Sequence, residues 1–130
     1  MKKLLLIFVL FITTLMYSQD NPFYMRAESF KSGKKDYKGT VIWDDSSQKN
    51  CDILIRLDDQ QATVYSQTKQ IYRVISMTTK NNQGSIWYCV DDKGNYCNLC
   101  LINLTSMPGK LAFAIEYNDY SWFYVCKPSN

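Results

Sequence analysis

The sequence predicts an all-β protein, an antiparallel up-and-down meander of seven to eight strands preceded by a signal-peptide helix. Short apolar runs separated by turn residues at regular intervals indicate strands rather than helices. The composition agrees, because the 130 residues include 10 Tyr, 6 Phe and 3 Trp, whereas Glu28 and Glu116 are the only glutamates. Since no long crossover connection is visible, we expect the meander to close into a small barrel, with a β-sandwich as the alternative.

Residues 1–18 have the pattern of a secretory signal peptide. Lys2 and Lys3 give a positive start, an unbroken apolar run covers residues 4–12, and the segment then becomes more polar up to Ser18. The apolar run is shorter than the about 20 residues that a membrane-spanning helix needs. We therefore expect cleavage after Ser18 and a periplasmic or secreted protein that keeps no stable membrane anchor.

Cleavage would also change the charge balance of the chain. Removing 18 of 130 residues leaves 112, and the loss of Lys2 and Lys3 reduces 15 basic residues to 13 against 12 acidic ones, so the net charge falls from +3 to +1. Such a chain has no electrostatic reason to bind nucleic acid or an anionic membrane. The polar residues 19–39 are predicted to be a solvated N-terminal lead-in to a single β domain at residues 40–127.

The first half of this predicted domain contains four strands. Ile53, Ile55 and Leu57 recur at every second position, which is the period of a strand with one buried face. The polar stretch at residues 44–50 is predicted to be a loop, and further turn residues follow each later apolar run. These boundaries place strands at residues 40–43, 52–57, 62–66 and 71–79.

Residues 85–104 predict a hairpin whose register can be assigned. A type I turn at Asp92-Lys93, followed by Gly94 in the left-handed conformation, gives a three-residue loop with a bulge. Both faces of the hairpin are apolar, so we expect it to lie centrally and to be covered on both sides. The turn sets three cross-strand pairs, which are Val90 with Tyr96, Cys89 with Cys97, and Trp87 with Leu99.

A second hairpin is predicted between residues 111–117 and 120–124. Asn118 and Asp119 suit a two-residue turn because both tolerate a positive φ. Aromatic and branched side chains then face each other across the strands, and each such pair stabilises a hairpin by about 0.2–1 kcal/mol. The expected pairs are Tyr117 with Tyr120, Ile115 with Trp122, and Phe113 with Tyr124.

An odd number of cysteines, five, remains after cleavage, which leaves at least one thiol unpaired in an oxidising compartment. Cys89 and Cys97 are neighbours in the expected register, and that position is compatible with a disulfide or with a buried pair of free thiols. Cys97 and Cys100 form a CxxC pattern inside a strand, unlike redox motifs, which begin a helix. Filling the core is the simplest role for the five, Cys51, Cys89, Cys97, Cys100 and Cys126.

Histidine is absent from the chain, which removes catalytic triads and the usual general base near neutral pH. We predict no metal site, because a four-cysteine zinc site usually needs two CxxC pairs. No catalytic residue and no cofactor are predicted. Adjacent carboxylates lie in predicted turns, where Asp caps the local backbone; they are Asp44-Asp45, Asp58-Asp59 and Asp91-Asp92.

Aromatic residues cluster in the C-terminal half of the chain. Core packing accounts for such a cluster, but Tyr and Trp also give recognition surfaces a large contact area with a polar end. We predict a non-enzymatic β module that binds a protein or a small apolar ligand through this aromatic face. The candidate ligand-binding residues are Tyr88, Tyr96, Tyr117, Tyr120, Trp122 and Tyr124.

Three other functions stay open at this point. A carboxylate-dependent hydrolase would require an Asp or Glu that is buried in a cleft and has a raised pKa. An inhibitor of an envelope enzyme would use an exposed loop such as residues 44–50. A purely structural envelope protein would present a surface without a pocket.

The end of the leader, Tyr17-Ser18-Gln19-Asp20, precedes a domain with two distinctive segments. They are Trp87-x-x-x-Asp91-Asp92-x-Gly94-x-x-Cys97 and Ile115-Glu116-Tyr117-Asn118-Asp119. With these features, residues 71–125 resemble short secreted all-β proteins of Bacteroidota that have no assigned activity. The resemblance implies the compartment and the fold, and it implies no particular function.

Overall fold

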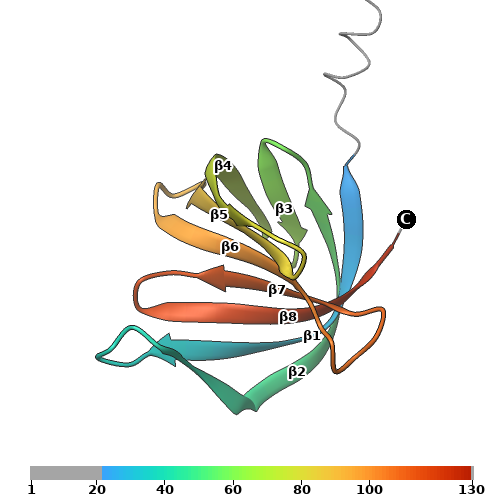
Figure 1. The fold of residues 1–130 in the computed structure, drawn as a ribbon, viewed down its shortest axis with the longest axis horizontal. Helices are drawn as coiled ribbons and strands as arrows, with labels where there is room; N and C mark the ends of the chain where they lie inside the picture. The colour runs from blue at the N-terminus through green and yellow to red at the C-terminus, as the bar shows by residue number, and fades with distance from the viewer. Residues whose placement is uncertain (1–21, 130) are drawn as a thin grey trace, which may run out of the picture.

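The computed structural model describes residues 22–129, which form eight antiparallel strands and no helix (Figure 1). The strands pair in chain order and β8 returns to β1, so the sheet closes into a barrel. The predicted meander and small barrel are confirmed, and the sandwich alternative is wrong. The predicted signal peptide at residues 1–18 lies outside the described residues. The strands are β1 Phe23–Lys35, β2 Val41–Leu57, β3 Gln61–Tyr65, β4 Lys69–Lys80, β5 Gly84–Asp91, β6 Tyr96–Asn103, β7 Leu111–Glu116 and β8 Tyr120–Pro128.

The segment predicted to be a solvated lead-in, residues 19–39, instead contains β1. This strand pairs with β2 on one side and with β8 on the other, so it closes the barrel. Met25 and Ala27 are completely buried. The lysines that suggested a solvated arm lie on the other face or at the strand end, and the Nζ atom of Lys31 lies 5.2 Å from the ring centroid of Phe123.

The polar stretch predicted to be a loop, residues 44–50, is part of β2, so two strands predicted separately are one. The pairing of β1 with β2 shifts register there, since Phe30 pairs with Lys49 while Ser32 already pairs with Asp44. The Ser47 hydroxyl accepts the Ser32 N–H there and the Asp44 carboxylate accepts the Ser46 N–H, which satisfies backbone donors next to the shift. β2 bends sharply near its middle, at the bottom of Figure 1.

Both predicted hairpins form with the predicted registers. Gly94 has a φ of +86°, as the three-residue loop requires. The turn between β7 and β8 closes with a hydrogen bond of 2.9 Å from the Tyr117 N–H to the Tyr120 carbonyl oxygen. The expected positive φ at Asn118 and Asp119 is wrong, because within residues 22–129 only glycines have a positive φ.

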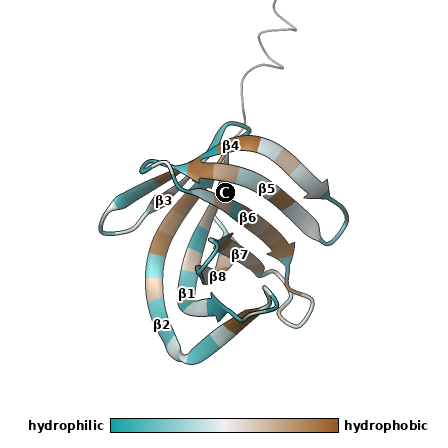
Figure 2. Ribbon diagram, turned by 90° about the vertical axis from the view of Figure 1, so that its left-hand side faces the viewer, coloured by the Kyte–Doolittle hydropathy of each residue, from teal (hydrophilic) through white to brown (hydrophobic). Residues whose placement is uncertain are grey.

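Side chains fill the interior of the barrel. The largest of the fully buried ones are Phe113, Met25, Ile55, Leu99 and Ile115. Small residues such as Ala27, Ala62 and Cys89 share this core with them, as expected for eight strands, which enclose little more than the volume of their own side chains. Figure 2 shows apolar and polar residues alternating along several strands, which is the pattern of one face in the core and one outside.

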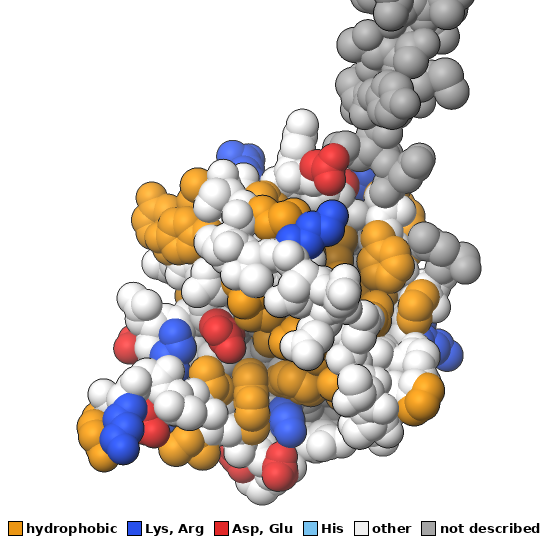
Figure 3. Space-filling model, in the orientation of Figure 1, with side chains coloured by type: hydrophobic (Ala, Val, Ile, Leu, Met, Phe, Trp, Pro, Cys, Tyr) orange, Lys and Arg blue, Asp and Glu red, His pale blue; other side chains and the backbone are white. Residues whose placement is uncertain are grey.

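The hairpin of β5 and β6 is covered on one face only. Its inward residues Cys89, Cys97 and Leu99 are buried, but Tyr88 and Tyr96 on the opposite face are 37% and 58% exposed. The predicted cover on both faces is therefore wrong. A single sheet that closes on itself has its core inside, and within residues 22–129 no further strand or helix packs on this outer face. Apolar side chains gather over β5 and β6 on the surface shown in Figure 3. Within residues 22–129 no helix is long and apolar enough to cross a membrane.

Candidate functional site

A hollow of about 500 Å³ lies where the β5–β6 turn approaches the β7–β8 turn. Four of the six candidate residues line it, which are Tyr88, Tyr96, Tyr117 and Tyr120. They come from the middle of β5, the start of β6, the β7–β8 turn and the start of β8. We call this the first hollow.

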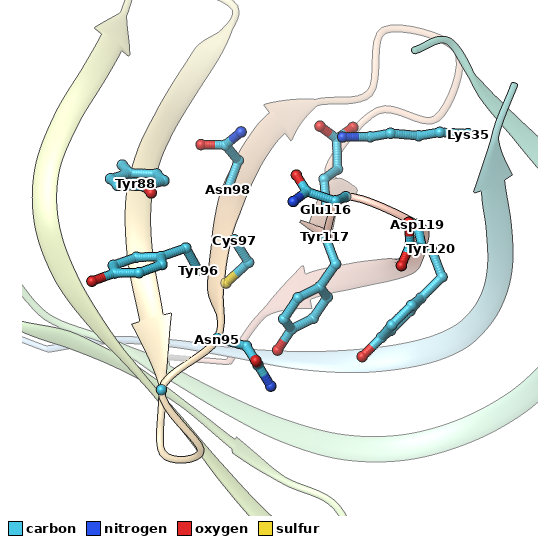
Figure 4. A pocket seen from close by; sticks show the side chains of 12 residues that line it. Lys35, Tyr88, Asn95, Tyr96, Cys97, Asn98, Glu116, Tyr117, Asp119 and Tyr120 are labelled. Atoms are coloured by element: carbon cyan, nitrogen blue, oxygen red, sulfur yellow. The ribbon is translucent and has the colours of Figure 1, made fainter. Parts of the chain in front are cut away.

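The four tyrosines form two stacked pairs. The rings of Tyr88 and Tyr96 have centroids 5.5 Å apart and planes 8° apart, while those of Tyr117 and Tyr120 are 4.9 Å and 24° apart. Figure 4 shows the two pairs on opposite sides of the first hollow, with Asn95 between them. Tyr96 is 58% exposed and Tyr120 is 44% exposed, so each pair presents one ring to solvent.

Polar side chains complete the lining of the first hollow. Asn95, Asn98 and Asn118 contribute amides, and Glu116 and Asp119 contribute carboxylates. Lys35 reaches the hollow from β1, the strand that was predicted to be part of the lead-in. Figure 4 shows the Lys35 and Glu116 side chains on the same side of the hollow. The site therefore combines flat aromatic surfaces with groups that donate and accept hydrogen bonds.

Tyr117 is fixed in place by Asp91 at the end of β5. Its hydroxyl donates a hydrogen bond of 2.8 Å to Asp91 Oδ2, while Asp91 Oδ1 accepts the N–H groups of Lys93 and Asn95 at 3.0 and 2.8 Å. Burial raises the pKa of Asp91, but hydrogen bonds from the turn backbone and from Tyr117 outweigh this effect and lower it below its usual range. Burial and the hydrogen bond to Asp91 raise the pKa of Tyr117, so its hydroxyl stays protonated at neutral pH.

A second hollow of about 200 Å³ lies next to the first. The two hollows share Asn95, Tyr117 and Tyr120. The second hollow adds Trp122, whose ring lies edge-on to Tyr120 with centroids 6.4 Å apart, and Tyr72. We call the two adjacent hollows, which share Asn95, Tyr117 and Tyr120, the tyrosine groove.

Tyr124, the sixth candidate residue, lies in the core. It is 6% exposed, and its ring centroid lies 6.0 Å from that of Phe30 and 6.2 Å from that of Phe113. Tyr124 pairs with Phe113, as the sequence predicts, and it lies two residues further along β8 than Trp122 on the same face of the strand. The same alternation that places Trp122 at the groove therefore buries Tyr124.

Cys89 and Cys97 are the expected cross-strand partners, and both thiols are free. Burial raises the pKa of Cys89 to about 11. Burial, together with Cys89 and Asp91 nearby, raises the pKa of Cys97 to about 12. All five cysteines lie within residues 22–129 and none forms a disulfide there. In the same residues no three potential metal-ligating side chains come together.

The carboxylates outside the tyrosine groove mostly serve the fold. A hydrogen bond from Lys110 lowers the pKa of Glu28. Burial raises the pKa of Asp58, but hydrogen bonds from the backbone of its turn and from Arg56 outweigh this effect and lower it. These shifts keep both groups ionised, whereas a general acid needs a raised pKa.

A further hollow, of about 490 Å³, lies on the β1–β2 hairpin beside Trp43. The Trp43 ring packs edge-on against Phe123 with centroids 5.2 Å apart. Part of its face covers Gly33, where a Cβ atom would lie 2.7 Å from the Trp43 ring. The contact between Trp43 and Phe123 joins β2 to β8 across β1, so no local sequence pattern indicates it.

Comparisons with known proteins find no relative of this chain. No protein-family model matches it, and neither a curated protein nor a solved structure does. The resemblance to secreted proteins of Bacteroidota therefore stays a prediction.

Proposed function

We propose that the protein is a non-enzymatic, secreted or periplasmic β module that binds its ligand in the tyrosine groove. The observation that carries the proposal is the first hollow of about 500 Å³, which two stacked tyrosine pairs border. A hollow of that size is within the usual range of ligand sites. Because side chains fill the barrel interior, the ligand is held at the barrel end and not inside the barrel.

The groove is organised before a ligand arrives. Stacking restricts the four rings, and the hydrogen bond to Asp91 fixes the Tyr117 ring. Restricting side chains in advance reduces the conformational entropy that binding would otherwise cost. Tyrosine suits such a surface because it has a large apolar ring with a polar end and few rotatable bonds.

Binding accounts for the groove better than catalysis does. The Asp91 carboxyl at the groove has a lowered pKa and already accepts three hydrogen bonds. Tyr117 has a raised pKa and is not a base at neutral pH. A hydrolase would need one carboxyl with a raised pKa opposite an ionised one.

The cysteines are compatible with export. Thiolates react with oxidants far faster than thiols, and burial raises the pKa of Cys89 and Cys97 well above neutral. Buried thiols of this kind stay reduced in an oxidising compartment because they are poorly accessible and poorly ionised. The signal-peptide pattern at residues 1–18 supports the same location.

NMR mapping tests the proposal. The ¹⁵N-labelled protein is titrated with a fixed probe set of indole, phenol, monosaccharides, short oligosaccharides and blocked tetrapeptides. We expect amide shift changes for at least one probe class that centre on Asn95, Asn98 and Asn118 and disappear in Tyr120→Ala. Tyr65→Ala is the matched control, because Tyr65 is 42% exposed but lines neither hollow. No shifts with any probe, or shifts centred on Trp43, would contradict the proposal.

A further inference from the structure

We propose that the ligand of the tyrosine groove is a neutral carbohydrate chain that lies across both hollows. This inference rests on the proposed binding function and adds the chemical class and shape of the ligand. Three observations carry it: the adjacency of the two hollows, the mixture of aromatic rings and amides in their linings, and the excess of carboxylates.

The adjacency of the two hollows points to an elongated ligand. The first hollow, of about 500 Å³, and the second, of about 200 Å³, share three lining residues, so a ligand that extends past these residues would contact both hollows. Aromatic rings line both hollows, with Tyr96 at the first, Trp122 at the second and Tyr120 at both. A linear chain of similar rings can place one unit near each of these side chains.

The chemistry of the lining matches sugar rings. The face of an aromatic ring carries partial negative charge, which attracts the slightly positive C–H groups on the flat face of a pyranose. Tyr96 and Tyr120 each belong to a stacked pair and both are exposed. Sugar hydroxyls donate and accept hydrogen bonds, and so do the side-chain amides of Asn95 and Asn98.

The charge of the lining favours a neutral chain over an acidic one. Four carboxylates and two lysines line the two hollows, an excess of two negative charges, and they are Asp91, Asp92, Glu116, Asp119, Lys35 and Lys93. A chain of uronic acids would bring like charges together. A purely apolar ligand would bury amides and carboxylates without hydrogen-bond partners, which costs free energy.

A peptide is the main competitor for this groove, and the sheet argues against it. Extended peptides commonly bind by adding a strand to a free sheet edge. β5, β6, β7 and β8 surround the groove, and each of them pairs with a neighbour on both sides. These strands therefore present no free edge at the groove, and side chains supply the contacts.

Calorimetry with oligosaccharides of increasing length tests the inference. The neutral probes are cello-, malto-, xylo- and chito-oligosaccharides of two to six units, and the comparison probes are oligogalacturonates and blocked tetrapeptides. We expect at least one neutral series to bind at least tenfold more tightly as four units than as two. Tyr120→Ala and Tyr96→Ala should each weaken that binding about tenfold, whereas Tyr65→Ala should leave it unchanged.

The outcomes separate this inference from the proposed function. Groove binding of tetrapeptides or oligogalacturonates without any neutral oligosaccharide would overturn the carbohydrate inference and leave the binding function standing. Equal affinity for two and four units would overturn the elongated ligand. Absence of binding by every probe, in calorimetry and in the amide shifts of Asn95 and Asn98, would overturn both. Circular dichroism of each variant checks that the barrel has folded.

Discussion

Replacing Asp91 by alanine should loosen both the β5–β6 turn and the tyrosine groove. The Asp91 carboxylate accepts two backbone N–H groups of its own turn, at 3.0 and 2.8 Å. It also accepts the Tyr117 hydroxyl at 2.8 Å. Asp91→Ala removes all three hydrogen bonds at once, so its effect on the free energy of unfolding should exceed that of an ordinary surface substitution.

The size of the effect follows from these three contacts. All three bonds have the same charged acceptor, and the part-buried bond from Tyr117 contributes about 1.5–3 kcal/mol, whereas solvent weakens each of the two exposed turn bonds to about 0.5–1.5 kcal/mol. The lower ends apply, because Lys93 and Asn95 are exposed and water can replace the lost acceptor. We expect Asp91→Ala to lower the free energy of unfolding by about 2.5 kcal/mol, of which about 1.5 kcal/mol comes from the hydrogen bond of Tyr117.

A double-mutant cycle in urea measures the Tyr117 part. Asp91→Ala, Tyr117→Phe and the double variant are unfolded under the same conditions, and the coupling free energy is taken from the four values. We expect a coupling of about 1.5 kcal/mol. A coupling below about 0.5 kcal/mol, the usual error of additivity, would refute the claim that Asp91 holds the Tyr117 ring in place.

Three further predictions concern the core, the pH dependence and the thiols. Phe113→Ala should lower the free energy of unfolding by about 3–5 kcal/mol in urea, because the side chain is completely buried, and a loss below about 1 kcal/mol would contradict the filled interior. The lowered pKa values of Asp58 and Asp91 contribute stability that is present above about pH 4 and is lost as the pH falls through the folded-state pKa. The urea concentration at the unfolding midpoint should therefore decrease as the pH is lowered from 5 to 3, and it should decrease less in Asp58→Asn. An equal decrease in both proteins would show that Asp58 does not contribute to the pH dependence of stability. Iodoacetamide should modify Cys51 first, because it is the one cysteine that is not buried, and mass spectrometry would contradict this order if Cys89 reacted as fast.

The two C-terminal hairpins could be predicted in register because their determinants are local. Gly94 supplies the left-handed position that the loop after Asp91 needs, and Tyr117 and Tyr120 meet directly across a two-residue turn. Alternation along each strand then fixes every pair further from the turn. The β7–β8 turn forms without the positive φ expected at Asn118 and Asp119, so the register of this hairpin does not depend on that turn type.

β1 could not be predicted because its burial depends on a distant partner. Only Met25, Ala27 and Gly33 are buried along its thirteen residues. Its pairing with β8 joins segments about a hundred residues apart, and no local pattern encodes such a contact. The polar stretch of β2 was missed for a related reason, since the register shift next to Phe30 lets polar residues continue a strand.

The candidate site was predicted in part. Clustering of aromatic residues identified the four tyrosines of the first hollow and also Trp122 at the second. The clustering did not distinguish the groove residues from the buried Tyr124, because Tyr124 lies two residues after Trp122 and faces the same side of β8. Lys35 and Tyr72 were missed because they come from β1 and β4, which only the closure of the barrel brings to the groove.

Intermolecular NOEs test most directly where a ligand binds. The measurement uses ¹³C-filtered NOESY on the labelled protein with the tightest-binding probe of the oligosaccharide panel. We expect NOEs from the ligand to the rings of Tyr96 and Tyr120, which border the first hollow. NOEs to Leu99 or Phe113, which lie inside the barrel, would contradict the claim that the interior is filled and that the ligand binds at the barrel end.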